Sequence, residues 1–257
     1  MTTLPAPGPA TRPPRPPGAL RMTRGRWLAL AIGVPVALAL IGWTGFSLIA
    51  TLGQASFPVD ATIPLEHGRL TASMDGADIV LRPGGDAGPG RARLTGTARY
   101  SLVRPHFAVH GGNLNYDCRI TAGNCGLDAH LAVPPQTAVI LSTGGGNLTA
   151  GDLGGTLRLS TGGGDANGHG LSARTVTTDS GGGNVTLVFT RPPANLDVTS
   201  GGGDITILLP PGRTGYAITD SPGGGDYSRA RTVPVNSASP NKIAVDSGGG
   251  NIRIGTS

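Results

Sequence analysis

Several residue types that carry catalytic or binding chemistry are scarce in this sequence. Its 257 residues include one lysine, Lys242, and one glutamate, Glu66, and aromatic residues make up 4%. No Gly-x-Ser-x-Gly motif and no glycine-rich loop ending in lysine occurs, so the usual signs of a serine hydrolase and of a phosphate-binding loop are missing. Few rings remain on which sugars or nucleobases could stack. The scarcity argues against these enzyme classes and against a nucleic-acid binder.

Charged residues are also sparse, at 14% of the chain. The formal net charge is +5, and five arginines within residues 1–26 account for it, because the rest of the chain holds 15 basic and 15 acidic residues. A neutral remainder gives no electrostatic argument for nucleic acid as a partner. Residues 1–26 also hold seven prolines, so we expect an extended, disordered cytoplasmic arm.

An uncharged, largely apolar run follows at residues 27–52. Its 26 residues are long enough for a helix that spans a bilayer. Because the arginines precede it, the positive-inside rule predicts a cytoplasmic N-terminus, a single pass through the cell membrane and an extracytoplasmic remainder. A cleaved signal peptide is the alternative, although its apolar part would be shorter, about 7–15 residues. Residues 53–62 are expected to form a tether.

A short phrase recurs through the second half of the chain. It consists of three glycines and an Asn or Asp, and Ser or Thr precedes the glycines in five of the six copies. Successive triplets begin 18, 19, 20, 22 and 25 residues apart. A fixed phrase at a period near 20 residues predicts a solenoid, in which each repeat stacks on the next. The triplets are residues 144–146, 162–164, 181–183, 201–203, 223–225 and 248–250.

Apolar and polar residues alternate on both sides of the triplets. In the third copy, Val176 lies five residues before the first glycine, and Val185 and Leu187 follow the triplet two residues apart. A period of two predicts strands with one buried face, and no helical period occurs after residue 52. We therefore expect an all-β, single-stranded solenoid behind one transmembrane helix. Each coil of about 20 residues would consist of a strand, a Gly-Gly-Gly-Asn/Asp corner and a second strand.

The corners are the predicted structural site. Glycine accepts the positive φ of a sharp turn, and corners stacked about 4.8 Å apart leave no room for side chains, so Gly182→Val is expected to destabilise the fold. Each Asn or Asp is expected to bond a nearby backbone amide, as in an Asx-turn, and to stack in one column. The corner residues are Gly144, Asn147, Gly162, Asp165, Gly181, Asn184, Gly201, Asp204, Gly223, Asp226, Gly248 and Asn251. A second column would hold the hydroxyls of Thr143, Thr161, Ser180, Ser200 and Ser247.

The remaining segments differ in regularity. Residues 136–257 hold the regular repeats, whereas residues 63–135 carry degraded copies and are expected to form irregular N-terminal coils. Cys118 and Cys125 are the only cysteines and predict a disulfide that closes a small loop, because a metal site would need further ligands. We expect the strand edge after the last repeat either to pair with another molecule or to be blunted by Arg253.

Two metal hypotheses arise, and neither is favoured. Calcium takes about 6–8 oxygen ligands, usually with several carboxylates, whereas half of the Asn/Asp column is neutral, so a structural ladder is the better interpretation. His106 and His110 would share one face of a strand and could join His130 in a three-histidine site. Nothing in the sequence places His130 beside them. We therefore predict no metal and no cofactor.

The six phrases behind one N-terminal anchor resemble the bacterial putative-adhesin family, also called the toastrack domain, most clearly over residues 139–254. The resemblance implies a β-solenoid fold and an association with envelope stress, and it supplies no catalytic residues. Together with the absent motifs, it leads us to predict a non-catalytic binding or adhesion module rather than an enzyme. Its expected partners are an envelope polymer, a membrane protein or a second solenoid end.

Two other functions stay open at this point. One is a polysaccharide-active enzyme on a β-helix scaffold, which would need a pair of carboxylates. The aspartates that could supply the pair are scattered in the sequence: Asp152, Asp179, Asp197 and Asp246. The other is a sensor ectodomain that signals through the transmembrane helix.

Overall fold

The computed structural model describes residues 54–84, 88–101, 104–118 and 125–257. The arm predicted at residues 1–26 and the span predicted at residues 27–52 lie outside these ranges. Among the described residues, no helix has the length and apolar character that crossing a membrane requires.

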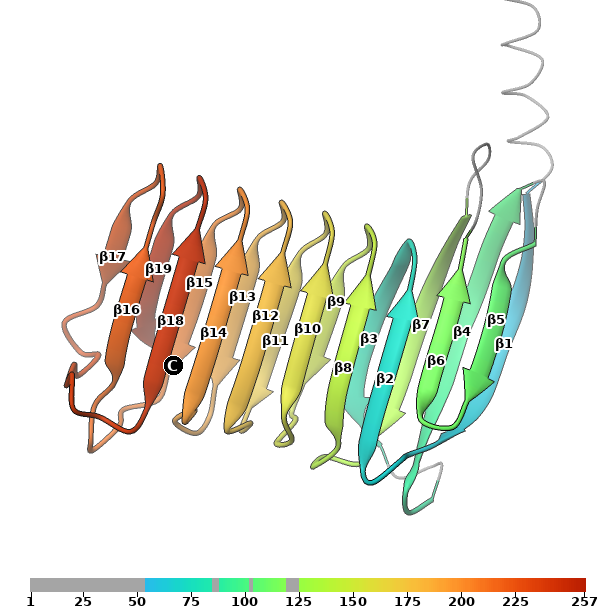
Figure 1. The fold of residues 1–257 in the computed structure, drawn as a ribbon, viewed down its shortest axis with the longest axis horizontal. Coiled ribbons are helices and arrows are strands. Elements are labelled where there is room, and N and C mark those ends of the chain that lie inside the picture. The colour runs from blue at the N-terminus through green and yellow to red at the C-terminus, as the bar shows by residue number, and fades with distance from the viewer. Residues whose placement is uncertain (1–53, 85–87, 102–103, 119–124) are drawn as a thin grey trace, which may run out of the picture. The chain divides into compact units, whose positions relative to one another are not determined.

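The described residues form nineteen strands in two sheets and no helix, which confirms the all-β class (Figure 1). The ten-stranded sheet A contains, in spatial order, β1 (Gln54–Pro64), β4 (Arg91–Ser101), β7 (Cys125–Val133), β3 (Ala77–Pro83), β9 (Leu148–Gly151), β11 (Ala166–Leu171), β13 (Val185–Phe189), β15 (Ile205–Leu209), β19 (Ile252–Thr256) and β17 (Tyr227–Arg229). The nine-stranded sheet B contains β16 (Ala217–Ser221), β18 (Lys242–Ser247), β14 (Asn195–Ser200), β12 (Thr175–Ser180), β10 (Leu157–Thr161), β8 (Ala138–Thr143), β2 (Arg69–Met74), β6 (Asn113–Asp117) and β5 (His106–His110).

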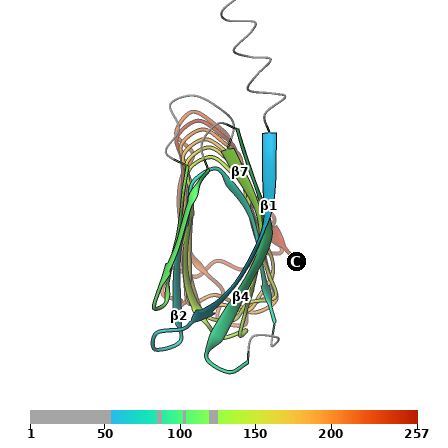
Figure 2. The same cartoon turned by 90° about the vertical axis from the view of Figure 1, so that its right-hand side faces the viewer.

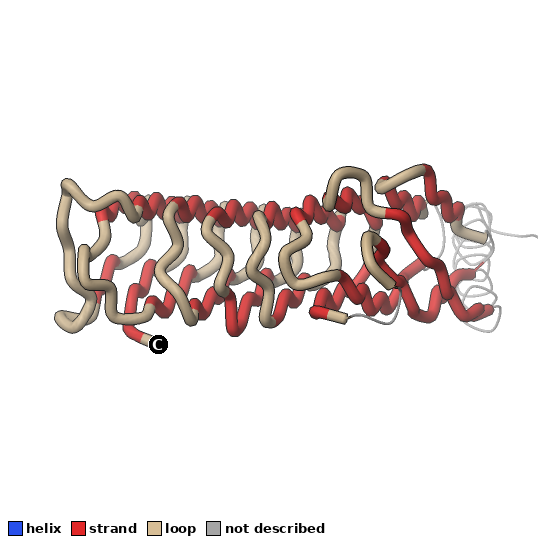
Figure 3. Tube along the Cα trace, turned by 90° about the horizontal axis from the view of Figure 1, so that it is seen from below, coloured by secondary structure: helices blue, strands red, loops and turns tan. Residues whose placement is uncertain are grey.

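Each regular coil passes once through both sheets. A strand of sheet B leads into a glycine corner and a strand of sheet A returns from it, so that the coil seen end-on is a flattened oval (Figure 2). Loops at the opposite edge cross back between the sheets (Figure 3). Neighbouring strands are parallel and in register, so that Leu159 of β10 is level with Leu141 of β8 and Thr178 of β12. This stacking of parallel strands confirms the predicted solenoid.

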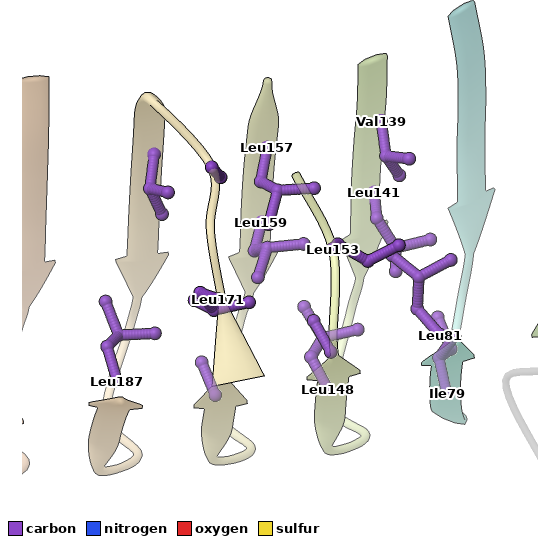
Figure 4. Close-up of a cluster of buried hydrophobic side chains, with 14 of the residues drawn as sticks. Ile79, Leu81, Val139, Leu141, Leu148, Leu153, Leu157, Leu159, Leu171 and Leu187 are labelled. Atoms are coloured by element: carbon purple, nitrogen blue, oxygen red, sulfur yellow. The ribbon is translucent and has the colours of Figure 1, made fainter. Parts of the chain in front are cut away.

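The core is a narrow apolar layer between the two sheets. From the coil of β6 and β7 to the coil of β18 and β19, the inward residues of each strand are buried and aligned, as Val139 and Leu141 of β8 and Ile79 and Leu81 of β3 show (Figure 4). Each such aliphatic side chain stabilises the fold by about 1.5–3 kcal/mol when fully buried. Thr178 also occupies this layer, and its hydroxyl has no hydrogen-bond partner.

The coils do not stack in the order of the chain. Near one end, β2 and β3 lie between the coil of β6 and β7 and the coil of β8 and β9. Near the other end, β18 and β19 lie between the coil of β14 and β15 and the coil of β16 and β17. The last repeat of the sequence is therefore an interior coil. The expectation that Arg253 blunts a terminal edge is wrong, because Arg253 lies level with Thr206 on one side and Ser228 on the other.

Antiparallel strands extend the solenoid beyond β6 and β7. β1 pairs with β4, β4 with β7, and β5 with β6. The tether expected at residues 53–62 is instead part of β1 from Gln54 on. Asp60 of β1 and Arg93 of β4 form an exposed ion pair with an N–O distance of 2.9 Å, and the hydrogen bond from Arg93 lowers the pKa of Asp60.

Turns and loops cover the core beyond β16 and β17. Tyr216 is fully buried, and its hydroxyl donates to the carbonyl of Pro210 at 2.6 Å. Val233 is buried beside this segment, and the buried Ser239 donates to the carbonyl of Gly215 at 2.7 Å. This end of the apolar layer is thus closed by residues 210–216 and 230–241 without a helix.

Candidate functional site

In five of the six triplets, the first and third glycines lie against the backbone of the neighbouring coil. A Cβ on Gly181 would overlap the carbonyl oxygen of Gly162, and one on Gly183 would overlap that of Gly164. A Cβ on Gly182, the middle glycine, would meet no atom within 4 Å. Among the six triplets only Gly223 has a positive φ. Close stacking therefore explains the first and third glycines of a triplet, whereas positive φ does not. The expectation that Gly182 cannot be replaced loses its basis.

A hydroxyl precedes five of the six triplets, where it is buried and joins two coils. Thr161 donates to the carbonyl of Gly146 in the adjacent coil at 2.9 Å and accepts from the N–H of Gly164 in its own corner at 3.0 Å. Such a satisfied buried bond contributes about 0.5–1.5 kcal/mol. Ser180, Ser200 and Ser247 make the same two bonds. Pro222 and Met74 occupy this position in two coils that lack the hydroxyl.

The Asn and Asp side chains form a ladder along the outside of the corners. Oδ1 of Asn147 accepts from the backbone N–H of Asp165 at 2.9 Å, and Oδ1 of Asp165 accepts from that of Asn184 at 2.7 Å. The expected local Asx-turn is therefore wrong for these residues, because the bond runs to the next coil. The same bond links the other neighbours in the ladder.

Carboxylate and amide alternate strictly in this ladder once the true order of the coils is followed. Strands about 4.8 Å apart would bring adjacent carboxylates close enough to repel by about 1 kcal/mol even in bulk water, and alternation roughly doubles that distance and halves the repulsion. At one end Asp78 is level with Asp128, whose charge is paired with Arg99. In spatial order the ladder reads Asp78, Asn147, Asp165, Asn184, Asp204, Asn251 and Asp226. From Asp78 to Asn251, one oxygen of each side chain thus accepts a backbone hydrogen bond, and Asp226 at the end of the ladder contributes its backbone N–H.

The three histidines of the disfavoured metal hypothesis are not brought together. His106 and His110 lie at the two ends of β5 at the edge of sheet B, whereas His130 lies on β7 in sheet A. Within the described ranges, no three His, Cys, Asp or Glu side chains are grouped in a way that could hold a metal ion.

A disulfide joins Cys118 to Cys125, which begins β7, with Cα atoms 6.1 Å apart. The hydroxyl of Tyr116 lies 3.4 Å from Sγ of Cys125 and donates to the carbonyl of Gly126 at 3.2 Å. Burial raises the pKa of Tyr116 to about 12, so this hydroxyl stays protonated at neutral pH.

The outer face of sheet B carries columns of polar side chains across the coils. One column follows the middle of the strands: Thr71, Ile140, Arg158, Thr177, Asp197, Ala244 and Thr219. The next column lies two residues further along: Ser73, Ser142, Ser160, Asp179, Thr199, Asp246 and Ser221. Arg69 on β2 and Arg158 on β10 are basic, whereas β12, β14 and β18 carry Asp179, Asp197 and Asp246 together with Lys242. This face is the candidate binding surface.

The sequence indicates which residues of this surface point outward but not which of them are neighbours. The alternation that locates the buried positions also locates the outward ones, so the signal was present for Asn195, Asp197 and Lys242. Which of these side chains become neighbours depends on the order of the coils, for which the repeats carry no signal.

Comparison with known proteins gives no family assignment. No family model and no curated protein matches the chain. A "putative cell adhesion protein" of solved structure from Clostridium sporogenes is 16% identical with a TM-score of 0.44, and the match covers 78% of this chain and 100% of that one. A "putative adhesin" from Bacteroides fragilis is 13% identical with a TM-score of 0.36, covering 78% and 97%. Likeness at this level assigns no function, and membership of the toastrack family stays a prediction.

Proposed function

We propose that this chain is a membrane-anchored, non-catalytic module whose solenoid binds a partner in the cell envelope. The uncharged run at residues 27–52 and the arginines before it support the anchor and its orientation. β1 begins at Gln54, two residues after that run.

The outer face of sheet B carries this proposal. It is a largely polar surface, broken by the apolar side chains of Ile140 and Ala244, and it is built from strands that are parallel and in register from β2 to β16. Arg158, Asp197 and Lys242 project from it, and the described residues show no ion pair among them. A repeated flat face with uncommitted polar groups can contact an extended partner over many coils.

Binding to isolated envelope fragments tests the proposal. We would place the full-length protein in lipid nanodiscs, immobilise it, and pass fragments that contain both polymer and protein over it, with and without calcium. We expect saturable binding that empty nanodiscs do not show. Calcium should not be required, because the Oδ1 atoms of the ladder already accept backbone hydrogen bonds. Absence of binding in both conditions would reject the function.

A polysaccharide-active enzyme is the second candidate, and one observation favours it. The structure brings three of the four scattered aspartates to neighbouring strands, because Asp197 lies diagonally across from both Asp179 and Asp246. Strand spacing and rise place such diagonal Cα atoms about 8 Å apart, and inverting hydrolases hold their carboxyl groups about 6.5–9.5 Å apart. The face is open, however, whereas a general acid relies on burial to keep its proton. Release of reducing ends from envelope glycans, lost in Asp197→Asn, would reverse this ranking.

A further inference from the structure

A hollow lies in the outer face of sheet B where the C-terminal coil is inserted. It has a volume of about 560 Å³ and extends across β12, β14, β18 and β16. Volumes of about 300–1,000 Å³ are typical of small-molecule sites. Its lining includes the polar side chains of Thr177, Asn195, Asp197, Thr219 and Lys242, and the methyl group of Ala244.

The side chain of Ala244 is the reason for the hollow. By register, Ala244 is level with Asp197 on β14 and with Thr219 on β16. Both of these side chains are longer than its methyl group and stand on either side of it. Lys242 precedes Ala244 by two residues and points to the same side of the sheet. The result is a short apolar floor surrounded by hydrogen-bonding groups.

Opposite charges flank this floor without meeting. Lys242 is diagonal to Asp197, at a Cα separation of about 8 Å, yet the described residues show no ion pair between them. Asn195, level with Lys242, and the hydroxyls of Thr177 and Thr219 add further donors and acceptors. A ligand over Ala244 can therefore donate to the carboxylate and accept from the ammonium at once.

The charge around the hollow restricts the ligand. Asp179, Asp197 and Asp246 share this part of the face with the single ammonium of Lys242. A net negative surface disfavours polyanions through like-charge repulsion. Sugar hydroxyls and acetamido groups are neutral and both donate and accept hydrogen bonds, which matches the mixed lining. A pyranose unit is also about as long as the strand spacing of about 4.8 Å, so a glycan can lie across successive coils.

From this geometry we infer that the hollow over Ala244 is a binding subsite for an uncharged, hydroxyl-rich or acetamido-bearing glycan chain lying across β14, β18 and β16. The inference rests on the proposed function and names the ligand class for the same face. Asp197 accepts from the glycan, Lys242 donates to it, and Ala244 leaves the space that the ring occupies.

Calorimetric titration of the full-length protein in nanodiscs with the N-acetylglucosamine hexamer tests the subsite. Ala244→Leu fills the floor and should reduce affinity at least about tenfold, which corresponds to about 1.4 kcal/mol of binding free energy. Ala244 is exposed, so the variant should keep the melting temperature of the wild type. The matched control is Ser160→Leu, which adds the same side chain to the outer face of β10 away from the hollow and should bind like the wild type.

Three results would overturn the inference. They are unchanged affinity in Ala244→Leu, tighter binding of an anionic oligogalacturonate than of the neutral hexamer, and no binding of the hexamer by the wild type. If the wild type fails here but still binds whole envelope fragments, the subsite is wrong and the proposed function stands. If it binds neither, both are wrong.

Discussion

At the scale of single residues, the three glycines of a corner are not equivalent. In the Gly181–Gly183 triplet, the first and third positions touch the backbone of the adjacent coil, and the middle one is open. A carbonyl oxygen cannot move aside as a flexible side chain can, because it belongs to the stacked backbone. The two contacts therefore determine how closely the coils approach.

Gly183→Ala should destabilise the solenoid, whereas Gly182→Ala should not. The added Cβ at Gly183 overlaps the carbonyl of Gly164, and forcing extra atoms into a packed site costs about 1–3 kcal/mol or more. The open site at Gly182 should change stability by no more than about 0.5 kcal/mol. Chemical denaturation of the two variants measures the difference. Equal losses of stability in the two variants would show that close approach of the backbones does not explain why glycine occupies the third position.

Thr178→Val should stabilise the protein. Thr178 is completely buried between Leu159 and Val198, and its hydroxyl has no partner, so its removal recovers part of a desolvation cost of about 1–3 kcal/mol. Valine keeps nearly the same shape. The control is Thr161→Val, which should destabilise because that hydroxyl both donates and accepts. If both variants lose stability in thermal unfolding, the Thr178 hydroxyl has a role that the structure does not show.

At the scale of elements, the sequence predicts the strands and the corner of each coil. It does not predict which coils are neighbours in the stack. A period of two around Val185 and Leu187 locates the strands, and the glycine phrase locates the corners. The repeats have similar inward residues and similar corners, so the bonds between coils can form in more than one order. No local sequence signal specifies that Asn251 lies between Asp204 and Asp226. Carboxylate and amide side chains alternate in the corner ladder only when the coils are taken in their spatial order.

The candidate site also depends on the order of the coils, which the sequence does not specify. Asp197, Ala244 and Thr219 are neighbours because the C-terminal coil is inserted between β14 and β16. In a stack that followed the chain, Asp197 and Thr219 would lie side by side and the hollow would not exist. The composition of the outer face could be predicted from the sequence, whereas its shape could not.

Asn184→Asp should weaken the corner ladder in a salt-dependent way. Asn184 lies between Asp165 and Asp204, so the change places three carboxylates in successive coils. We expect a loss of about 1–2 kcal/mol at low ionic strength, from about 1 kcal/mol for each new neighbour, and a smaller loss in 1 M salt, where the screening length is about 3 Å. Denaturation at both ionic strengths gives the comparison. The control Asp204→Asn adds no repulsion and should show little salt dependence; a large loss in Asn184→Asp that salt does not reduce would contradict this account.

At the scale of the whole molecule, the insertion of the last coil makes the C-terminus part of the interior of the stack. β18 and β19 pair on both sides, so removing residues 242–257 opens a gap instead of shortening the rod by one coil. The coil of β16 and β17 would then lose its described strand partners, and the loops that close the core would lose their support.

Limited proteolysis of the chain that lacks residues 242–257 tests this arrangement. We expect it to leave a resistant core that ends near Leu209. A stack in chain order would instead protect residues 217–229 after the same truncation, so the mass of the resistant fragment decides between the two arrangements. The intact protein is the control, and there the resistant core should extend to β19.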